Sequence, residues 1–240
     1  MGHAMDEPDL IAESRRLCRD LEQRLPRIHI PHPDATFTTA SGVTVTAKIP
    51  SKLAAVIGSL AWRAHDFAIL ACELFEGKRV IPGAVITRSL METTALFYLV
   101  QKKTAQAVSA RTLVSLDEFL VRCMSGSRLG NGDPDAPSVL TAIQALDKEP
   151  GCDGYAAFYA SLCEFAHPNA LGSFYAYSSF DSESRAIWFG HNRGLTNGGD
   201  VAFAVVFALE VLLEFLKRVG DMTPVVMQLA RETYPNDKAG

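Results

Sequence analysis

The sequence lacks the marks of a disulfide framework, a zinc site and a membrane span. Its five cysteines are scattered and odd in number, and no two of them form a C-x-x-C pair. They are Cys18, Cys72, Cys123, Cys152 and Cys163. Such a set is typical of reduced thiols in the cytoplasm. No run of about eighteen apolar residues occurs, so we expect a cytoplasmic protein that makes no contact with a membrane.

The motifs of several common enzyme classes are also missing. The sequence has no G-x-S-x-G elbow, no P-loop, no G-x-G-x-x-G turn after a strand and no cysteine in a His-paired motif. Its formal net charge is −4, which argues against a large nucleic-acid surface, since such a surface needs clustered Lys and Arg. We expect no cofactor, and the sequence leaves an enzyme and a binding protein both open.

Apolar stretches with helical spacing make up most of the 240 residues, 48% of which are hydrophobic. They predict helices over 6–25, 51–77, 80–103, 105–127, 137–147, 153–167 and 197–220, and a short last helix over 223–234. Ser51 is expected to cap the second of these. We therefore predict an all-α fold, a single-domain helical bundle. Residues 1–50 are expected to form an N-terminal helix and extended arm packed on a bundle of residues 51–240.

Two stretches have the period of a strand instead. Residues 35–50 alternate and are rich in Thr and Val, which favours a short strand, a hairpin or an extended arm. Between residues 172 and 192, two aromatic-rich runs flank an Asp-Ser-Glu-Ser turn, which predicts a small β-hairpin inserted in the bundle.

Charged residues inside apolar helices are informative because an unpaired buried charge is costly. Arg88 and Glu92 lie one turn apart on one helix face. They form either a surface ion pair or an inward pair that meets a partner from another helix. His167, which precedes Pro168 at the end of a helical pattern, is either a helix cap or that partner. We name Arg88, Glu92 and His167 as candidate catalytic residues around a polar cleft.

A second group of polar residues is predicted to contact a ligand. His65 and Asp66 form a polar island in an apolar helix, Asn169 follows the His-Pro corner, and His191 ends the hairpin. A structural role is the simpler alternative for His65, Asp66 and His191. Glu164 and His167 form an E-x-x-H motif, but a di-metal bundle site needs a second such motif. The sequence has none, so no metal site is predicted.

Three segments carry a resemblance: "TRSLMETTALFYLV", "YASLCEFAHPNALGS" and the hairpin that follows. Together they resemble the uncharacterised bacterial DUF5677-like helical family, over roughly residues 50 to 215. The resemblance implies a helical bundle with Arg88, Glu92 and His167 as the shared polar set. The chain is also similar, more loosely, to HEPN-type helical domains, some of which are RNases of toxin and phage-defence systems. Those carry Arg-x(4–6)-His on one helix, whereas here His167 comes from a second helix.

Two functional hypotheses follow. The first is a regulatory module, expected to be a homo-oligomer, whose cleft at Arg88, Glu92 and His167 binds a small ligand or a protein partner. The alternative is a metal-independent, HEPN-like RNase. In that case His167 is the general acid/base on RNA, Arg88 stabilises phosphate charge and Glu92 orients one of them.

Overall fold

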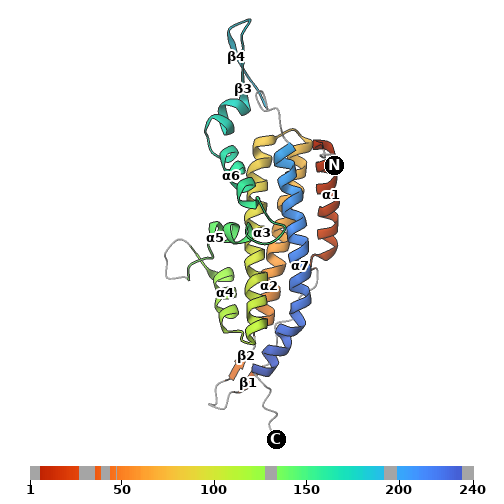
Figure 1. Ribbon diagram of the computed structural model, residues 1–240, viewed down its shortest axis with the longest axis vertical. Coiled ribbons are helices and arrows are strands. Elements are labelled where there is room, and N and C mark those ends of the chain that lie inside the picture. The colour runs from red at the N-terminus through yellow and green to blue at the C-terminus, as the bar shows by residue number, and fades with distance from the viewer. Residues whose placement is uncertain are drawn as a thin grey trace.

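A computed structural model describes residues 6–26, 36–38, 44–46, 48–127, 134–191 and 199–233 of the chain, and these are mainly helical, as predicted. The elements are, in chain order, α1 (Glu7–Arg24), β1 (Thr36–Thr38), β2 (Thr44–Thr46), α2 (Ile49–Glu76), α3 (Val80–Ala110), α4 (Val114–Ser125), α5 (Val139–Leu146), α6 (Tyr155–Ala166), the π-helical segment η1 (Ala170–Tyr175), β3 (Ser178–Asp181), β4 (Ala186–Phe189) and α7 (Gly199–Thr233). Figure 1 shows them as an elongated bundle with one hairpin at each end.

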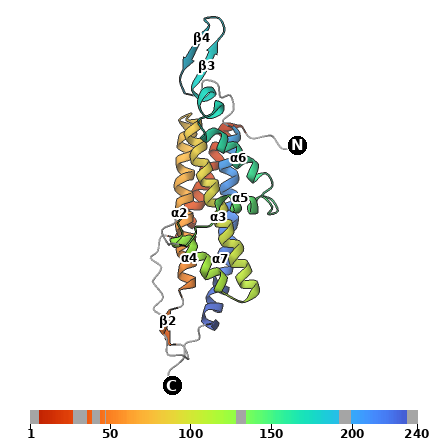
Figure 2. The same cartoon turned by 90° about the vertical axis from the view of Figure 1, so that its left-hand side faces the viewer.

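Four helices, α1, α2, α3 and α7, form the body of the bundle. The three-residue link Gly77–Arg79 turns the chain between α2 and α3, which therefore run antiparallel, as the short predicted connection requires. At the far end of α3, Arg111 pairs with Glu232 near the end of α7 at 2.6 Å, so these two helices run parallel. α4, α5 and α6 all pack on α3 (Figure 2). α1 contacts α2 and α7, and so is part of the bundle itself.

The core has two parts, which lie one after the other along the bundle. α1 has 18 residues and α7 has 35, so α1 covers only part of the length of its neighbour. In the first part, α1, α5 and α6 enclose side chains such as Leu21, Phe75 and Leu209. In the second part, α4 takes the place of α1 and encloses side chains such as Leu53 and Leu120. The short helices are needed because they complete the cover of the long ones.

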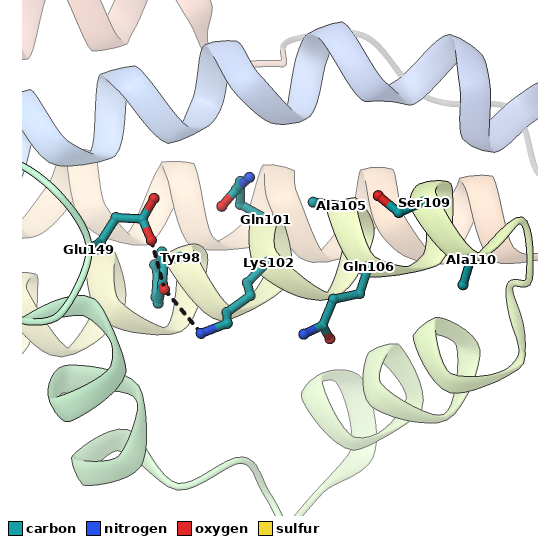
Figure 3. A pocket seen from close by; sticks show the side chains of 8 residues that line it. All are labelled: Tyr98, Gln101, Lys102, Ala105, Gln106, Ser109, Ala110 and Glu149. Atoms are coloured by element: carbon teal, nitrogen blue, oxygen red, sulfur yellow. Dashed lines mark hydrogen bonds between the residues drawn. The ribbon is translucent and has the colours of Figure 1, made fainter.

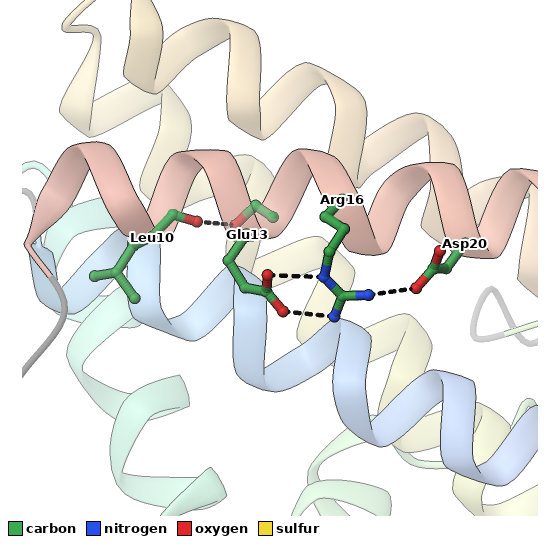
Figure 4. A network of polar contacts seen from close by, with 5 residues as sticks. Leu10, Glu13, Arg16 and Asp20 are labelled. Carbon is green, nitrogen blue, oxygen red and sulfur yellow. Dashed lines mark hydrogen bonds and ion pairs between the residues drawn. The ribbon is translucent and has the colours of Figure 1, made fainter. Parts of the chain in front are cut away.

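α1 begins and ends where the sequence predicts. The Asp6 side chain accepts a hydrogen bond from the backbone N–H of Asp9 at 2.9 Å, and the helix stops at Arg24, two residues before Pro26. On its exposed face Arg16 reaches Glu13 and Asp20, each at 2.6 Å (Figure 4). Surface pairs of this spacing contribute about 0.3–0.5 kcal/mol each, so this chain of contacts supports α1 only modestly.

The predicted boundary between the third and fourth helices is wrong. α3 continues to Ala110, and the break falls at Arg111, which has a left-handed backbone with φ of 50°. Residues 105–127 are therefore two elements, because Thr104 and Ala107 are buried and hold the extra turns of α3 in the core. α2 also differs: it starts at Ile49 with a proline in its first turn, so Ser51 does not cap it.

The predicted break before Pro224 is wrong as well, since α7 is one helix from Gly199 to Thr233. A proline inside a helix costs about 3 kcal/mol. The turns after it bury Val226 and Leu229 in the core, and each such side chain contributes roughly 1.5–3 kcal/mol. Burial therefore outweighs the local cost. The preceding residue, Thr223, donates its hydroxyl to the Val219 carbonyl one turn back at 2.9 Å.

The hairpin predicted between residues 172 and 192 is confirmed with narrower bounds, and of the alternatives left open for residues 35–50 the structure has a hairpin. β1 pairs antiparallel with β2, and β3 pairs antiparallel with β4. Residues 170–175, where the second hairpin was expected to begin, form η1 instead. Gly172 allows this tight segment, because a Cβ there would collide with the carbonyl oxygen of His167. The Asn169 side chain also accepts a hydrogen bond from the Gly172 N–H at 2.9 Å.

Within the part of the chain that the structure describes, one helix, α2, is long and apolar enough to cross a membrane when only its length and composition are considered. One such helix is weak evidence for a membrane span. α2 packs against α1, α3, α4 and α7, and the core helix of a bundle has the same apolar character.

The α2–α3 corner yields a stability prediction. A Cβ at Gly83 would overlap the ring of buried Phe75, whereas a Cβ at Gly220, on α7, would meet nothing within 4 Å. We expect Gly83→Ala to lower the free energy of unfolding by about 1–3 kcal/mol. The matched change Gly220→Ala should raise it by up to about 1 kcal/mol, because alanine favours the helix. Urea unfolding followed by circular dichroism measures both, and equal effects of the two changes would contradict the packing at this corner.

Candidate functional site

Arg88 and Glu92 form the predicted pair on α3, with 3.2 Å between Arg88 Nε and Glu92 Oε1. Their side chains are 34% and 27% exposed, so the pair is neither free in solvent nor deep in the core. A third residue from another helix joins it: Tyr159 of α6 donates its hydroxyl proton to Glu92 Oε1 at 2.9 Å. The Arg88 guanidinium lies 5.6 Å from the centre of the Tyr159 ring. Of the two alternatives, the pair therefore matches the inward one, in which a residue of another helix is the partner, and that residue is Tyr159.

Two tyrosines of α6 fix this arrangement. Tyr155 is fully buried and donates its hydroxyl to the carbonyl oxygen of Met91 at 2.9 Å, one turn before Tyr159 on the same helix face. Burial raises the pKa of Tyr155 well above its usual value, and burial is also the main cause that raises the pKa of Tyr159 to about 12. Both hydroxyls are therefore protonated donors at neutral pH, and the cluster holds α6 against α3.

His167 does not join this cluster. It is the exposed C-cap of α6, with an extended backbone (φ −81°, ψ 145°), and its N–H donates to the Cys163 carbonyl at 3.0 Å. Among the described residues, its ring makes no hydrogen bond or ion pair. Eight residues separate His167 from Tyr159, which corresponds to roughly 12 Å along a helix axis. At this separation His167 and Tyr159 cannot both contact Glu92, and Tyr159 is the one that does.

The four predicted ligand-binding residues occupy separate places. Asp66 is exposed on α2, while both ring nitrogens of His65 are buried without a hydrogen-bond partner in the described chain. Asn169 caps η1 and also donates to Glu164 Oε2 at 2.7 Å. His191 Nε2 lies 3.3 Å from Arg79 Nη1, beside the hairpin. The structure gives each of these residues local contacts and does not assemble them into one site.

The described residues contain no group of three or more His, Cys, Asp or Glu side chains placed to hold a metal ion. Glu164, the first residue of the E-x-x-H motif, accepts the hydrogen bond from Asn169. It also lines a cavity of about 290 Å³ with Asp200, between α6 and the start of α7.

A larger hollow lies along the second half of α3, and we call it the α3 groove (Figure 3). Its volume is about 640 Å³, which is in the range of known ligand sites. The lining side chains are Tyr98, Gln101, Lys102, Ala105, Gln106, Ser109 and Ala110 of α3, with Glu149 from the connection after α5. Steps of three and four residues place most of them on one helix face, which α4 and α5 leave uncovered.

One end of the α3 groove is closed by a polar network. The buried Tyr98 donates its hydroxyl to Glu149 Oε2 at 3.1 Å, and Lys102 Nζ donates to the Tyr98 oxygen at 3.3 Å. Arg218 of α7 donates to Glu149 Oε1 at 3.3 Å and to Glu214 at 2.8 Å. The Tyr98 ring packs against the ring of Phe215, with 5.1 Å between ring centres and 44° between their planes. Segments far apart in the sequence thus meet at Glu149.

The electrostatics of the groove suit binding better than proton transfer. Burial is the main cause that raises the pKa of Tyr98, so this hydroxyl keeps its proton at neutral pH. Hydrogen bonding to Glu214 raises the pKa of Arg218 above its already high value. Within the described chain, Gln101, Gln106 and Ser109 make no side-chain hydrogen bond, so their donors and acceptors face solvent. None of the lining residues forms a nucleophile–base pair.

Comparisons of the chain with protein-family models, with curated proteins and with solved structures find no significant match. Its function is therefore inferred from geometry.

Sequence patterns contain a partial signal for the α3 groove. Gln101, Lys102, Gln106 and Ser109 break the apolar pattern of α3, which was expected to end at 103. A predicted helix that continued to Ala110 would have placed these polar residues on one face. Tyr159 lies one turn from Tyr155, but nothing local links either residue to α3.

Tyr159 offers a pH test of the cluster. Its folded-state pKa of about 12 is above the value of about 10 for a solvated tyrosine. The stability that it contributes is therefore complete below pH about 10 and is lost as the pH rises toward about 12. We expect Tyr159→Phe to cost about 1 kcal/mol at neutral pH. The difference in tyrosinate absorbance between wild type and variant should titrate near 12, and a midpoint near 10 would contradict the contact.

Proposed function

We propose that the chain is a cytoplasmic binding module of a regulatory kind, and that its binding surface is the α3 groove. The partner segment is an extended peptide of another protein. The observation that carries this proposal is the row of unpartnered amide and hydroxyl side chains along a groove of about 640 Å³. This site takes the place of the cleft expected at Arg88, Glu92 and His167, because His167 lies about two turns of α6 beyond Tyr159, which contacts the pair.

The shape of the groove favours a chain-like ligand. It follows one helix from Tyr98 to Ala110, which corresponds to roughly 18 Å, the length of five or six extended residues. Small side chains, Ala105 and Ala110, alternate with longer polar ones along it. The small residues leave room for a backbone, and the longer ones stand beside it.

The chemistry of the lining favours a peptide backbone and one acidic group. Each glutamine amide offers both a donor and an acceptor, which matches the N–H and C=O of a peptide unit. Lys102 is exposed and uses one of its three donors on Tyr98, so it can also bind a carboxylate. Glu149 also lines the groove, and Arg218, 3.3 Å from its carboxylate, offsets the negative charge that an incoming acidic residue meets.

The RNase alternative has less support. It needs a histidine close to Arg88, and the described contacts give Arg88 a glutamate and a tyrosine instead. The raised pKa of Tyr159 makes this hydroxyl a poor proton acceptor at neutral pH. Binding is therefore the better account of the polar residues on α3.

Peptide selection tests the binding site. We expect a random peptide library to yield peptides with an acidic residue, and Ala105→Trp, which fills the groove floor, to weaken their binding roughly tenfold or more. Lys102→Met should weaken it by a similar factor. Ala157→Trp, on the exposed face of α6, is the matched control and should bind as the wild type does. Affinities from fluorescence anisotropy decide the matter. Selected peptides that bind Ala105→Trp equally well would show that the groove is not the site.

A direct assay tests the alternative. We expect purified protein to leave a single-stranded RNA intact in the presence of a metal chelator, because no described residue pairs with the His167 ring to set its tautomer. The His167→Ala variant serves as the matched control. Cleavage by the wild type that is lost in the variant would instead establish the RNase function.

A further inference from the structure

The β3–β4 hairpin has one strongly apolar face. Its register pairs Ser178 with Phe189 and Phe180 with Ile187, and these four residues share a face because opposite residues of an antiparallel pair point the same way. Ser178 is buried at the base, whereas Phe180 is 64% exposed, Ile187 49% and Phe189 76%. A two-residue period that sorts apolar side chains to one face is the pattern of a strand whose face is covered. Here none of the described elements covers it.

The turn of the hairpin is polar and well fixed. The Asp181 carboxylate accepts hydrogen bonds from the N–H of Glu183 at 3.0 Å and from the Ser184 hydroxyl at 2.5 Å. Arg185 completes the turn with a left-handed backbone, φ 54°. The charged residues of the hairpin are thus gathered at its tip, and the aromatic residues lie along its length.

The two edges of the hairpin differ. β3 packs against η1, whereas β4 forms the other edge of a two-stranded sheet and pairs with no further described strand. Natural proteins protect exposed edges with charges, prolines or bulges. The β4 sequence, Ala-Ile-Trp-Phe, has no charge or proline, and its register with β3 has no bulge. An edge of this kind is a template for another strand.

The hairpin is also placed where a second molecule can reach it. In both views it projects beyond the end of the bundle (Figures 1 and 2). A strand that pairs with β4 therefore does not have to displace a helix.

We propose that β4 pairs antiparallel with β4 of a second copy of this chain about a two-fold axis. The dimer contains a four-stranded sheet in the order β3, β4, β4 of the second copy, β3 of the second copy. A two-fold interface brings the same surface of both copies together, so one self-complementary strand is sufficient to build it.

The side-chain pattern selects the register. The apolar faces of both hairpins coincide only if a residue lies opposite its own counterpart, because neighbouring residues point to opposite faces. With Trp188 opposite Trp188 of the second copy, Ile187 lies opposite Phe189 in both directions. One face of the sheet then carries six apolar side chains, and the other carries a pair of tryptophans across the axis. Aromatic cross-strand pairs of this kind stabilise sheets.

The apolar side chains of β4 support a weak association. Ile187, Trp188 and Phe189 are 49–76% exposed, and edge-to-edge pairing brings them beside their counterparts. The two faces of the sheet stay open, and Phe180 and η1 lie on the far side of each hairpin, so the buried area is below the roughly 1,000 Å² of a stable interface. We therefore expect a dimer that forms only at high concentration.

A lipid bilayer fits the hairpin less well than a second copy does. Insertion from the tip would bury the carboxylates of Asp181 and Glu183 before any aromatic side chain reached the lipid. The single positive charge of the turn, Arg185, does not balance them. Pairing along the β4 edge leaves these charges in water.

Sedimentation equilibrium of the full chain tests the proposal. We expect the weight-average mass to rise with concentration toward twice that of one chain. Phe189→Asp should weaken this association roughly tenfold or more, because it places a charge in the apolar face of the dimer. Leu140→Asp is the matched control: Leu140 is 60% exposed on α5, and its substitution should leave the association unchanged.

Disulfide trapping tests the register. Cysteines directly opposite one another in an antiparallel pair are close enough to bond, at roughly 4.5–5.5 Å between Cα atoms. We expect Trp188→Cys to form a covalent dimer on mild oxidation by oxidised glutathione. Ser179→Cys, on the partner strand at the level of Trp188, lies three strand spacings, roughly 14 Å, from its counterpart and should remain monomeric under reducing-agent-free electrophoresis.

Three results would overturn the proposal. They are a wild type that stays monomeric at all concentrations, a dimer that Phe189→Asp leaves intact, and a Ser179→Cys variant that cross-links as readily as Trp188→Cys. A monomer that sediments with anionic lipid vesicles would show that the face binds membranes instead.

Discussion

The burial of α3 is the constraint on which the rest of the structure depends. α3 packs against α2, α4, α5, α6 and α7, so nearly every polar side chain on it needs a partner inside the protein. Thr87 and Thr104 donate to carbonyls of their own helix, and Thr94 donates to Ala208 of α7. Tyr159 donates a hydrogen bond to Glu92 beside Arg88, and Tyr98 donates one to Glu149. The α3 groove is the one long part of this helix face that the described elements leave without such partners.

Local periodicity was sufficient to predict the helices, because apolar spacing and end residues are contained in a short window of sequence. It failed where distant packing overrides a local signal. Pro224 has a strong local preference against a helix interior, but the residues after it are buried by α2, α3 and α4. The break at Arg111 has a left-handed backbone, but arginine is not one of the residues that usually mark such a turn. The chain turns there because α4 packs on α2 and α3 directly afterwards.

The candidate site shows the same division. Arg88 and Glu92 could be predicted as a pair because four residues separate them on one helix. Their third partner is 67 residues away, and Glu149 is 51 residues from Tyr98, so no spacing rule connects them. His167 was a reasonable candidate from its place after a helical pattern. The two turns of helix between it and Tyr159 carry it past the pair, and that distance depends on how deeply α6 docks.

The groove and the hairpin lie on different parts of α3, and this separation matters for how they work together. α3 begins beside the hairpin, where Arg79 reaches His191, and the groove starts at Tyr98, roughly 27 Å further along the helix axis. A dimer joined by β4 therefore leaves both grooves open. In the proposed dimer, two grooves would bind a partner with two copies of a segment at a high effective concentration, which raises avidity without a new contact. On these two proposals, a weak, open groove on a small module becomes an effective binding surface because the hairpin supplies the second copy.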